Sequence, residues 1–262
     1  MSDELLSHAD GAVHRLTINR PARRNALTPA VARAIAMAID EVEDAGQAEL
    51  VVLRGAGGHF SAGLDLHWLR SLGETPGITD LQRGLADFQA AALAVVRCPV
   101  PVLAVVEGTA AGFGLDLALP CDLRLASSTA SFTSAFARMG LVPDGGSTFT
   151  LPRLVGIGPA LRLLLAGETI DAARAQAIGL VDEVVDAATL ESEVTALATR
   201  LTAGATSSVR AIKRLVRSQE IGVLEQVLAT EGAAQLPALQ GPESRRRLEA
   251  CAARRAGRAE GA

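Results

Sequence analysis

The hydrophobic and polar positions of the chain follow two patterns in turn, one typical of strands and one typical of helices. Residues 12–19 alternate and are rich in β-branched side chains, which predicts a strand. Thr28 and Pro29 then supply an N-cap and a first-turn proline for an alanine-rich helix that we expect to reach about Ala45. Residues 50–54 predict the next strand, which runs into a glycine-rich bend.

The same order of strand, bend and helix recurs further along the chain. Residues 73–79 predict a surface loop, and residues 80–97 return to helical spacing. Residues 102–106 read as a buried strand, residues 108–114 form a second bend of small residues, and another strand is expected near 122–126. Repeated strand-to-helix units of this kind predict an α/β core.

The last third of the chain has a different pattern. From about Leu190 onward no further strand is predicted, and apolar residues recur at helical spacing, at Leu201, Ile212, Leu215, Val223, Val227 and Leu236. This part of the chain is therefore predicted to be helical.

Composition excludes several classes of protein. The chain has 262 residues, which suits one large domain, with no Tyr, one Trp, six Phe and four His. A tyrosine acid is excluded, and aromatic rings for stacking bases are scarce. A formal charge of −4 provides no positive field for a phosphate backbone, so we expect no nucleic-acid partner.

Cysteine usage and the apolar runs bear on the compartment. The three cysteines, Cys98, Cys121 and Cys251, are far apart, which argues against a disulfide framework and against a C-x-x-C metal or redox site. The acidic start of the chain lacks the apolar run of a signal peptide, and residues 100–106 are too few to cross a bilayer. We expect a cytoplasmic protein that does not enter a membrane.

The two bends can supply backbone hydrogen-bond donors. FSAGLDL (residues 60–66) and EGTAAGFGLDLAL (residues 107–119) place small residues where a strand ends and a helix begins, so backbone N–H groups can point outward. If the bends converge, two donors can stabilise an oxyanion, an effect of about 2.7 to 4 kcal/mol per donor in other enzymes. Taken singly, such bends more often serve tight packing.

In this combination and order, the motifs identify the chain as similar to the crotonase (enoyl-CoA hydratase/isomerase) superfamily. The resemblance covers nearly the whole chain and rests on INRPARRNAL (18–27), VVLRGAGGHFSAGLDL (51–66), VEGTAAGFGLDLALPCDLRLAS (106–127), GLVPDGGSTFTLPRLVG (140–156) and ARAQAIGLVDEVV (173–185).

The resemblance implies an architecture and a ligand. We expect an α/β, crotonase-like spiral core of ββα units over residues 1–195, followed by a C-terminal helical trimerisation region over residues 196–262. The expected assembly is a homotrimer or a homohexamer. The implied substrate is an acyl-CoA thioester, with no metal and no cofactor beyond the coenzyme A that the substrate itself carries.

The resemblance also places the binding residues. The oxyanion donors fall on the N–H groups of Leu64 and Phe113, although the Phe113 side chain could equally be core packing. Phe136 is expected in the substrate-binding wall. The coenzyme A moiety is expected to run past Arg24, Ala26, Ala62, Asp65 and Leu66. A solvated turn is the alternative for Arg24.

The carboxylates decide the reaction. The hydratases of the superfamily activate a water with two glutamates, and here Asp116 and Phe136 occupy those two positions. Phe136 cannot transfer a proton, so the standard hydratase pair is incomplete. Asp116 also has a simpler interpretation, as a residue near a helix N-terminus that the helix dipole stabilises.

Asp144, in VPDGG, matches the single acid of the enoyl-CoA isomerases, including the phenylacetate-pathway type. One carboxylate is enough to move a double bond, because it can remove a proton at C2 and return it at C4. Phe113, Phe136 and Leu141 would raise its pKa by desolvation. As alternatives, Asp144 is an ordinary turn residue or caps a helix that starts near Ser147.

We therefore expect an enzyme that converts a 3-enoyl-CoA to the conjugated 2-enoyl-CoA, with Asp144 as base and acid. One alternative is a hydratase or hydrolytic reaction that uses Asp116 with Asp144. Another is a nucleophilic role for Asp144, as in a dehalogenating branch of the superfamily. A third is an oligomer that binds acyl-CoA without turnover.

Overall fold

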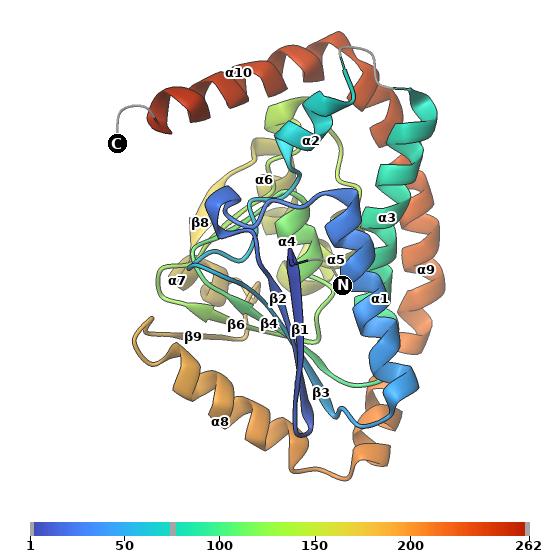
Figure 1. The fold of residues 1–262 in the computed structure, drawn as a ribbon, viewed down its shortest axis with the longest axis vertical. Helices are drawn as coiled ribbons and strands as arrows, with labels where there is room; N and C mark the ends of the chain where they lie inside the picture. The colour runs from blue at the N-terminus through green and yellow to red at the C-terminus, as the bar shows by residue number, and fades with distance from the viewer. Residues whose placement is uncertain (1–2, 74–76, 260–262) are drawn as a thin grey trace.

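The computed structural model describes residues 3–73 and 77–259 and places two sheets among helices (Figure 1). The larger sheet has the strand order β1-β2-β3-β4-β6-β9, and only its β1–β2 pair is antiparallel. Its strands are β1 (Leu5–Asp10), β2 (Val13–Ile18), β3 (Leu50–Gly55), β4 (Val102–Val106), β6 (Leu123–Ser127) and β9 (Glu183–Val185). A smaller sheet has the order β5-β7-β8, with β5 (Thr109–Ala111), β7 (Ser131–Thr133) and β8 (Thr169–Asp171).

The α/β class predicted from the sequence is confirmed, and several element boundaries agree closely. Helix α1 (Pro29–Ala45) begins after Thr28, whose hydroxyl accepts a hydrogen bond from the N–H of Val31, so the predicted N-cap is present. Helix α3 (Ile78–Arg97) covers the predicted 80–97 segment. Residues 74–76 of the predicted surface loop lie outside the described residues. Strand β1 was not predicted.

The larger sheet is buried on both faces, because helices cover each side. Alternate residues of β3 and β4, such as Val51 and Ala104, belong to the main core with α1 and α3. Their neighbours Leu50 and Leu103 pack on the opposite face against α8 (Leu190–Thr202). Burial on both faces explains why these strands are continuous apolar runs rather than alternating ones.

The remaining helices complete the chain. They are α2 (Leu66–Ser71), α4 (Phe113–Ala118), α5 (Ser147–Val155), α6 (Ile157–Ala166), α7 (Ala172–Ala177), α9 (Thr206–Gln240) and α10 (Pro242–Ala259). Of these, α4 and α7 pack on the small sheet. Helices α1, α3 and α9 stand side by side at the right of Figure 1, and α10 crosses the top of the molecule. Among the described residues, no helix is both long and apolar enough to cross a membrane.

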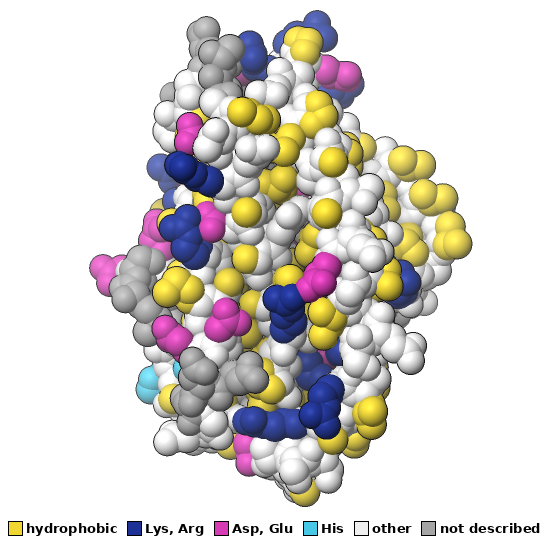
Figure 2. Space-filling view, turned by 90° about the vertical axis from the view of Figure 1, so that its right-hand side faces the viewer, with side chains coloured by type: hydrophobic (Ala, Val, Ile, Leu, Met, Phe, Trp, Pro, Cys, Tyr) yellow, Lys and Arg dark blue, Asp and Glu magenta, His cyan; other side chains and the backbone are white. Residues whose placement is uncertain are grey.

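Helix α9 confirms the predicted helical region, but it buries a different face from the one its apolar residues suggest. Ile212, Leu215 and Val223 are exposed. The side that packs on α3 and α5 instead contains the buried residues Lys213, Leu224, Leu228, Glu231 and Gln235. Figure 2 shows the α3 and α9 side of the molecule, where hydrophobic side chains lie between charged ones. The domain boundary at residue 195 falls inside α8 and stays a prediction.

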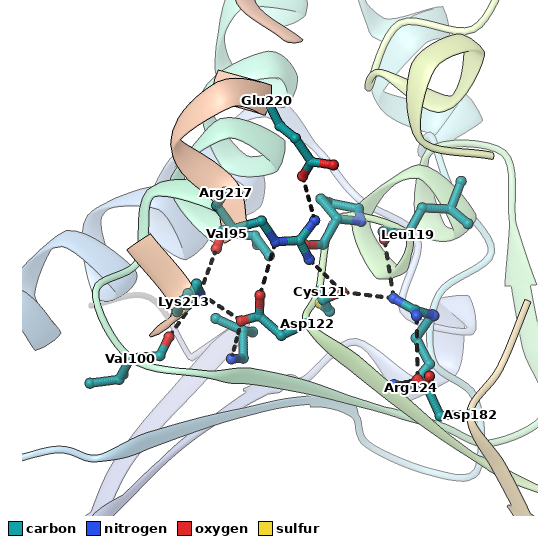
Figure 3. Close-up of polar contacts among 12 residues, drawn as sticks. Val95, Val100, Leu119, Cys121, Asp122, Arg124, Asp182, Lys213, Arg217 and Glu220 are labelled. Atoms are coloured by element: carbon teal, nitrogen blue, oxygen red, sulfur yellow. Dashed lines mark hydrogen bonds and ion pairs between the residues drawn. The ribbon is translucent and has the colours of Figure 1, made fainter. Parts of the chain in front are cut away.

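A buried ionic network joins α9 to the larger sheet (Figure 3). Asp122 pairs with Lys213 at 2.6 Å and with Arg217 at 3.1 Å, and it also accepts the N–H of Val102 at 2.8 Å. Lys213 donates in addition to the carbonyl of Val100. Every charge in the network has an opposite charge or a carbonyl beside it, so the network fixes α9 against the start of β4 and β6.

Candidate active site

The two glycine-rich bends lie against each other at the end of the larger sheet. The N–H of Ser61 donates to the carbonyl of Thr109, and the N–H of Ala111 donates back to the carbonyl of Ser61. The bends therefore run like two short parallel strands, and Ser61 forms a bridge with Ala110. The convergence on which the oxyanion hypothesis depends is present.

Gly63 is the point of closest approach between the bends. Its φ is +81°, and a Cβ there would lie 2.4 Å from the carbonyl oxygen of Ala111 and 3.2 Å from the nitrogen of Phe113. Only glycine fits this conformation and this space. The absence of a side chain brings the peptide that precedes Leu64 next to the first turn of α4.

The backbone N–H groups of Leu64 and Phe113 remain available as donors. On either side of Leu64, the Gly63 carbonyl and the Asp65 N–H both bond to Leu27. Phe113 is the first residue of α4, where an N–H has no partner within the helix. Neither N–H hydrogen-bonds to another of the residues that the structure describes. Two free donors at adjacent bends can stabilise a negative oxygen.

A cavity of about 90 Å³ opens beside these donors. Its wall includes Ala62, Leu64, Leu66 and Gly112, and six large apolar side chains enclose it: Phe88, Phe113, Phe136, Met139, Leu141 and Leu248. The Phe88 and Phe113 rings pack with their centres 4.6 Å apart. The Phe113 side chain thus serves both the core and the cavity wall.

The residues predicted to bind coenzyme A divide into two groups. Ala62 and Leu66 line the cavity, as does Phe136, whereas Arg24, Ala26 and Asp65 are not among its lining residues. Asp65 is buried, caps α2 through the N–H groups of His67 and Trp68, and pairs with Arg20 at 2.7 Å. These contacts lower the pKa of Asp65 despite its burial.

Arg24 and Ala26 belong to the turn that follows β2, which contacts the first bend. Arg24 is exposed, and its backbone adopts the left-handed conformation. Its carbonyl accepts the N–H of Ala62 at 2.9 Å. Ala26 is buried, and its carbonyl accepts a hydrogen bond from the Arg20 guanidinium. Arg24 therefore supports the first bend through its carbonyl, whereas the backbone of Ala26 bonds to Arg20 and Arg23.

Asp144 is the only titratable side chain on the cavity wall among the described residues. Its side chain is only 8 % exposed, and desolvation raises its pKa to about 7. Oδ2 accepts a hydrogen bond of 3.0 Å from Nε2 of Gln235, whereas Oδ1 is buried and has no partner among the described residues. Helix α5 starts at Ser147 without a side-chain cap, so Asp144 does not cap it.

Asp116 is fully buried and does not line the cavity. Its Oδ2 accepts the N–H of Gly145 at 3.1 Å, and a Cβ on Gly145 would come within 2.7 Å of Cβ of Asp116 and 2.8 Å of the Phe113 ring. The loop around Asp144 therefore packs directly on Asp116 and on the Phe113 ring. Burial, followed by the charges of Glu231 and Asp144, raises the pKa of Asp116 well above its usual range.

Two site residues come from α9, and sequence analysis missed both. Gln235 contacts Asp144, and Glu231, one turn earlier, accepts the N–H groups of Gly146 at 2.7 Å and Thr148 at 3.0 Å. Together they hold both ends of the loop that carries Asp144. The only signal in the sequence was a pair of polar residues spaced by four on a helix, which by itself does not identify a buried face.

Comparison with known proteins identifies the family. A family model described as Enoyl-CoA hydratase/isomerase matches residues 8–249. The chain belongs to this family. It is 34 % identical over 232 residues to a 1,2-epoxyphenylacetyl-CoA isomerase of Escherichia coli, covering 88 % of each chain. It is also 36 % identical over 217 residues to a probable enoyl-CoA hydratase of Rhodobacter capsulatus, covering 82 % of each.

The similarity to the enoyl-CoA hydratase/isomerase family also holds for the three-dimensional structure, over nearly the whole chain. An enoyl-CoA hydratase from Mycobacterium avium subsp. paratuberculosis superposes with a TM-score of 0.87 at 32 % identity, covering 95 % of this chain and 99 % of that one. The chain is therefore an acyl-CoA enzyme of the enoyl-CoA hydratase/isomerase type, and the predicted crotonase-like fold is confirmed. Because the similar proteins include both hydratases and isomerases, similarity does not decide between the two reactions, and the choice between them rests on the side chains of the site.

Proposed function

We propose that the protein is an enoyl-CoA isomerase that moves the double bond of a 3-enoyl-CoA to the 2-position. The observation that carries this proposal is the single acid on the cavity wall. Among the described residues, only Asp144 can exchange a proton with a bound acyl chain, and the remaining wall is almost wholly apolar. Isomerisation needs one such group, because a proton leaves one carbon and returns to another of the same chain.

The geometry supports a two-step proton transfer. With the thioester oxygen at the N–H groups of Leu64 and Phe113, the Asp144 carboxylate removes a proton from C2 and leaves a dienolate. The C3–C4 electron pair of the dienolate then takes the same proton at C4, so that the new double bond lies between C2 and C3. A pKa of about 7 suits both steps, since Asp144 can hold the proton and release it near neutral pH.

Hydration is less well supported by this arrangement. Addition of water across a double bond needs groups that activate the water and protonate the neighbouring carbon. Phe136, which lines the cavity, cannot transfer a proton, and Asp116 is not among the lining residues. A hydratase that uses Asp116 with Asp144 would require the Asp116 carboxyl to reach the cavity.

A spectroscopic assay separates the two reactions. The protein and its Asp144→Asn variant are each mixed with a 3-enoyl-CoA and, separately, with a 2-enoyl-CoA, while the absorbance of the conjugated thioester is followed. We expect absorbance to rise with the 3-enoyl substrate only, and not in the variant. Formation of a 3-hydroxyacyl-CoA from the 2-enoyl substrate would instead show hydration, and a covalent acyl adduct on Asp144 in the mass spectrum would show a nucleophile.

A further inference from the structure

Gln235 makes a contact with Asp144 that the isomerase mechanism above does not use. Gln235 is 2 % exposed and reaches the cavity wall from α9. Its side-chain amide has two partners: Nε2 donates to Oδ2 of Asp144 at 3.0 Å, and Oε1 accepts the N–H of Val142 at 2.9 Å. The amide therefore bridges the backbone and the carboxyl of the same loop.

The Val142 contact fixes which end of the amide faces Asp144. A backbone N–H can only donate, so the amide oxygen must point to Val142 and the NH₂ group must point to Asp144. An NH₂ group cannot accept a hydrogen bond there. Oδ2 of Asp144 is therefore held as an acceptor whether the carboxyl is ionised or protonated.

Oδ1 has both lone pairs unused, whereas one lone pair of Oδ2 is occupied by the Gln235 amide, so Oδ1 is the oxygen better placed to take the proton that Asp144 gains during turnover. Oδ1 is buried, has no hydrogen-bond partner among the described residues, and belongs to a side chain on the cavity wall. A buried carboxyl oxygen without a partner is costly unless a ligand or a reaction uses it. A thioester substrate with an acidic C–H bond at C2 would give Oδ1 a proton to take.

We propose that Gln235 is a positioning residue that holds Oδ2 of Asp144 and so makes Oδ1 the oxygen that removes and returns the substrate proton. This inference rests on the proposed isomerase function. Gln235 does not touch the reacting carbons in this account and acts only through Asp144. No bond to Gln235 forms or breaks, and the proton moves only between Oδ1 and the substrate.

The charges around Asp144 show why such a donor matters. From α9, Glu231 raises the pKa of Asp144, and its own carboxylate is held by backbone N–H groups. From α4, Asp116 accepts the N–H of Gly145, and its pKa is raised well above the usual range. Helices α3 and α10 present apolar side chains, Phe88 and Leu248. Gln235 is thus the side chain that favours the ionised form of Asp144.

The test changes the end of the amide that faces Asp144 and preserves the other end. In Gln235→Glu, one carboxylate oxygen can still accept the Val142 N–H, but the other faces Oδ2 with no donor. The two acids must then share a proton, as close carboxyl pairs do. Gln235→Met removes the hydrogen bonds to both Asp144 and Val142 and keeps a side chain of similar size. Gln89→Leu is the matched control, because Gln89 donates to the Leu228 carbonyl of α9 and does not line the cavity.

The measured quantity is the pH dependence of kcat/KM for conjugation of a 3-enoyl-CoA. We expect the acidic limb to move upward by at least about one pH unit in Gln235→Glu, so that kcat/KM at pH 6 falls about tenfold or more. Activity at pH 9 should stay within about tenfold of wild type. Gln89→Leu should keep the wild-type midpoint. A Gln235→Glu midpoint equal to that of Gln89→Leu would overturn the inference, because a purely structural role is satisfied by the Val142 contact.

A second readout keeps the test valid if a variant is inactive. The Asp144 carboxyl is titrated by infrared difference spectroscopy, with Asp144→Asn in the same background as the reference. Its midpoint should rise in both Gln235→Glu and Gln235→Met, and an unchanged midpoint in both would refute the inference. If Asp144→Asn itself retains isomerase activity, the proposed function fails. If Asp144→Asn is inactive and the midpoints do not move, only the role of Gln235 fails.

Discussion

Two clusters of acids contact the same helix, α9, and their charges are balanced in opposite ways. Around Asp122, the carboxylate has two cations beside it, Lys213 and Arg217 (Figure 3). Around Asp144, three carboxyl groups lie close together, and no cation pairs with Asp144, Asp116 or Glu231 among the described residues. Only N–H and hydroxyl donors hold these three acids.

The difference separates a structural cluster from a candidate catalytic one. A paired buried charge stays ionised and fixes the elements it joins, which is what Asp122 does for α9. Burial without a cationic partner raises the pKa of Asp116 and of Asp144, and the pKa of Asp144 reaches about 7. The ionised form of such a group destabilises the folded protein, but a group with this pKa can both take up and release a proton near neutral pH. The cluster that departs from the pairing rule is therefore the one we assign to chemistry.

The largest expected effect lies in the paired cluster. Asp122→Ala leaves Lys213, which is 9 % exposed, without its counter-ion, and should lower the free energy of unfolding by about 3–5 kcal/mol in chemical denaturation. Glu243→Ala is the control, because it removes only an exposed Arg247 pair on α10 and should cost about 0.3–0.5 kcal/mol. Equal losses in the two variants would show that the Asp122 network is no more than a surface interaction.

The second effect concerns the pH dependence of stability. The folded pKa of Asp144 is about 7, above its ordinary value of 3.8, so the folded state binds more protons than the unfolded state between these values. The contribution of Asp144 to the free energy of unfolding is fully present below about pH 4. It is lost as the pH rises to about 7, with a slope of about 1.4 kcal/mol per pH unit.

Asp144→Asn removes this contribution, because the amide cannot ionise. The variant should lose less stability than wild type between pH 5 and pH 7 in denaturant titrations. Asp116 is present in both proteins, but the charge of Asp144 raises the pKa of Asp116, so the difference reports Asp144 together with its coupling to Asp116. Parallel pH curves for the two proteins would mean that Asp144 is already ionised at pH 5.

The smallest effect is expected for the other acid of the unpaired cluster. Asp116→Asn mimics the neutral acid that burial already favours, and its side-chain oxygen can still accept the Gly145 N–H. Isomerase kcat/KM should stay within about tenfold of wild type. A loss as deep as that of Asp144→Asn would place both acids in the reaction and revive the hydratase alternative.

The sequence predicted those parts of the fold that local patterns encode. The Thr28 and Pro29 signal placed the start of α1, and the apolar run of β4 marked a doubly buried strand. Strand β1 was missed because LLSHAD does not alternate between apolar and polar residues, and it is paired only on one side, to β2. Family resemblance, rather than periodicity, identified the two bends as a joint site.

The contribution of α9 to the site could not be predicted from local pattern. Gln235 lies 91 residues from Asp144 in the chain, and nothing near either residue signals the contact. The apolar spacing on α9 pointed to Ile212 and Leu215, which are exposed, whereas Lys213 and Glu231 are buried because distant partners satisfy them. Tertiary hydrogen bonding overrode the amphipathic pattern there.

The most direct test of the account is a single-turnover measurement on Asp144→Asn and wild type. Each protein is saturated with a 3-enoyl-CoA at pH 8, and both the rate constant of conjugation and the Kd of the same thioester are recorded. The account predicts a fall in the rate constant of about 10²- to 10⁴-fold, with little change in Kd, because the variant loses proton transfer and keeps the cavity and the oxyanion donors. An unchanged rate constant, or a loss confined to Kd, would contradict the assignment of Asp144 as the proton-transferring group.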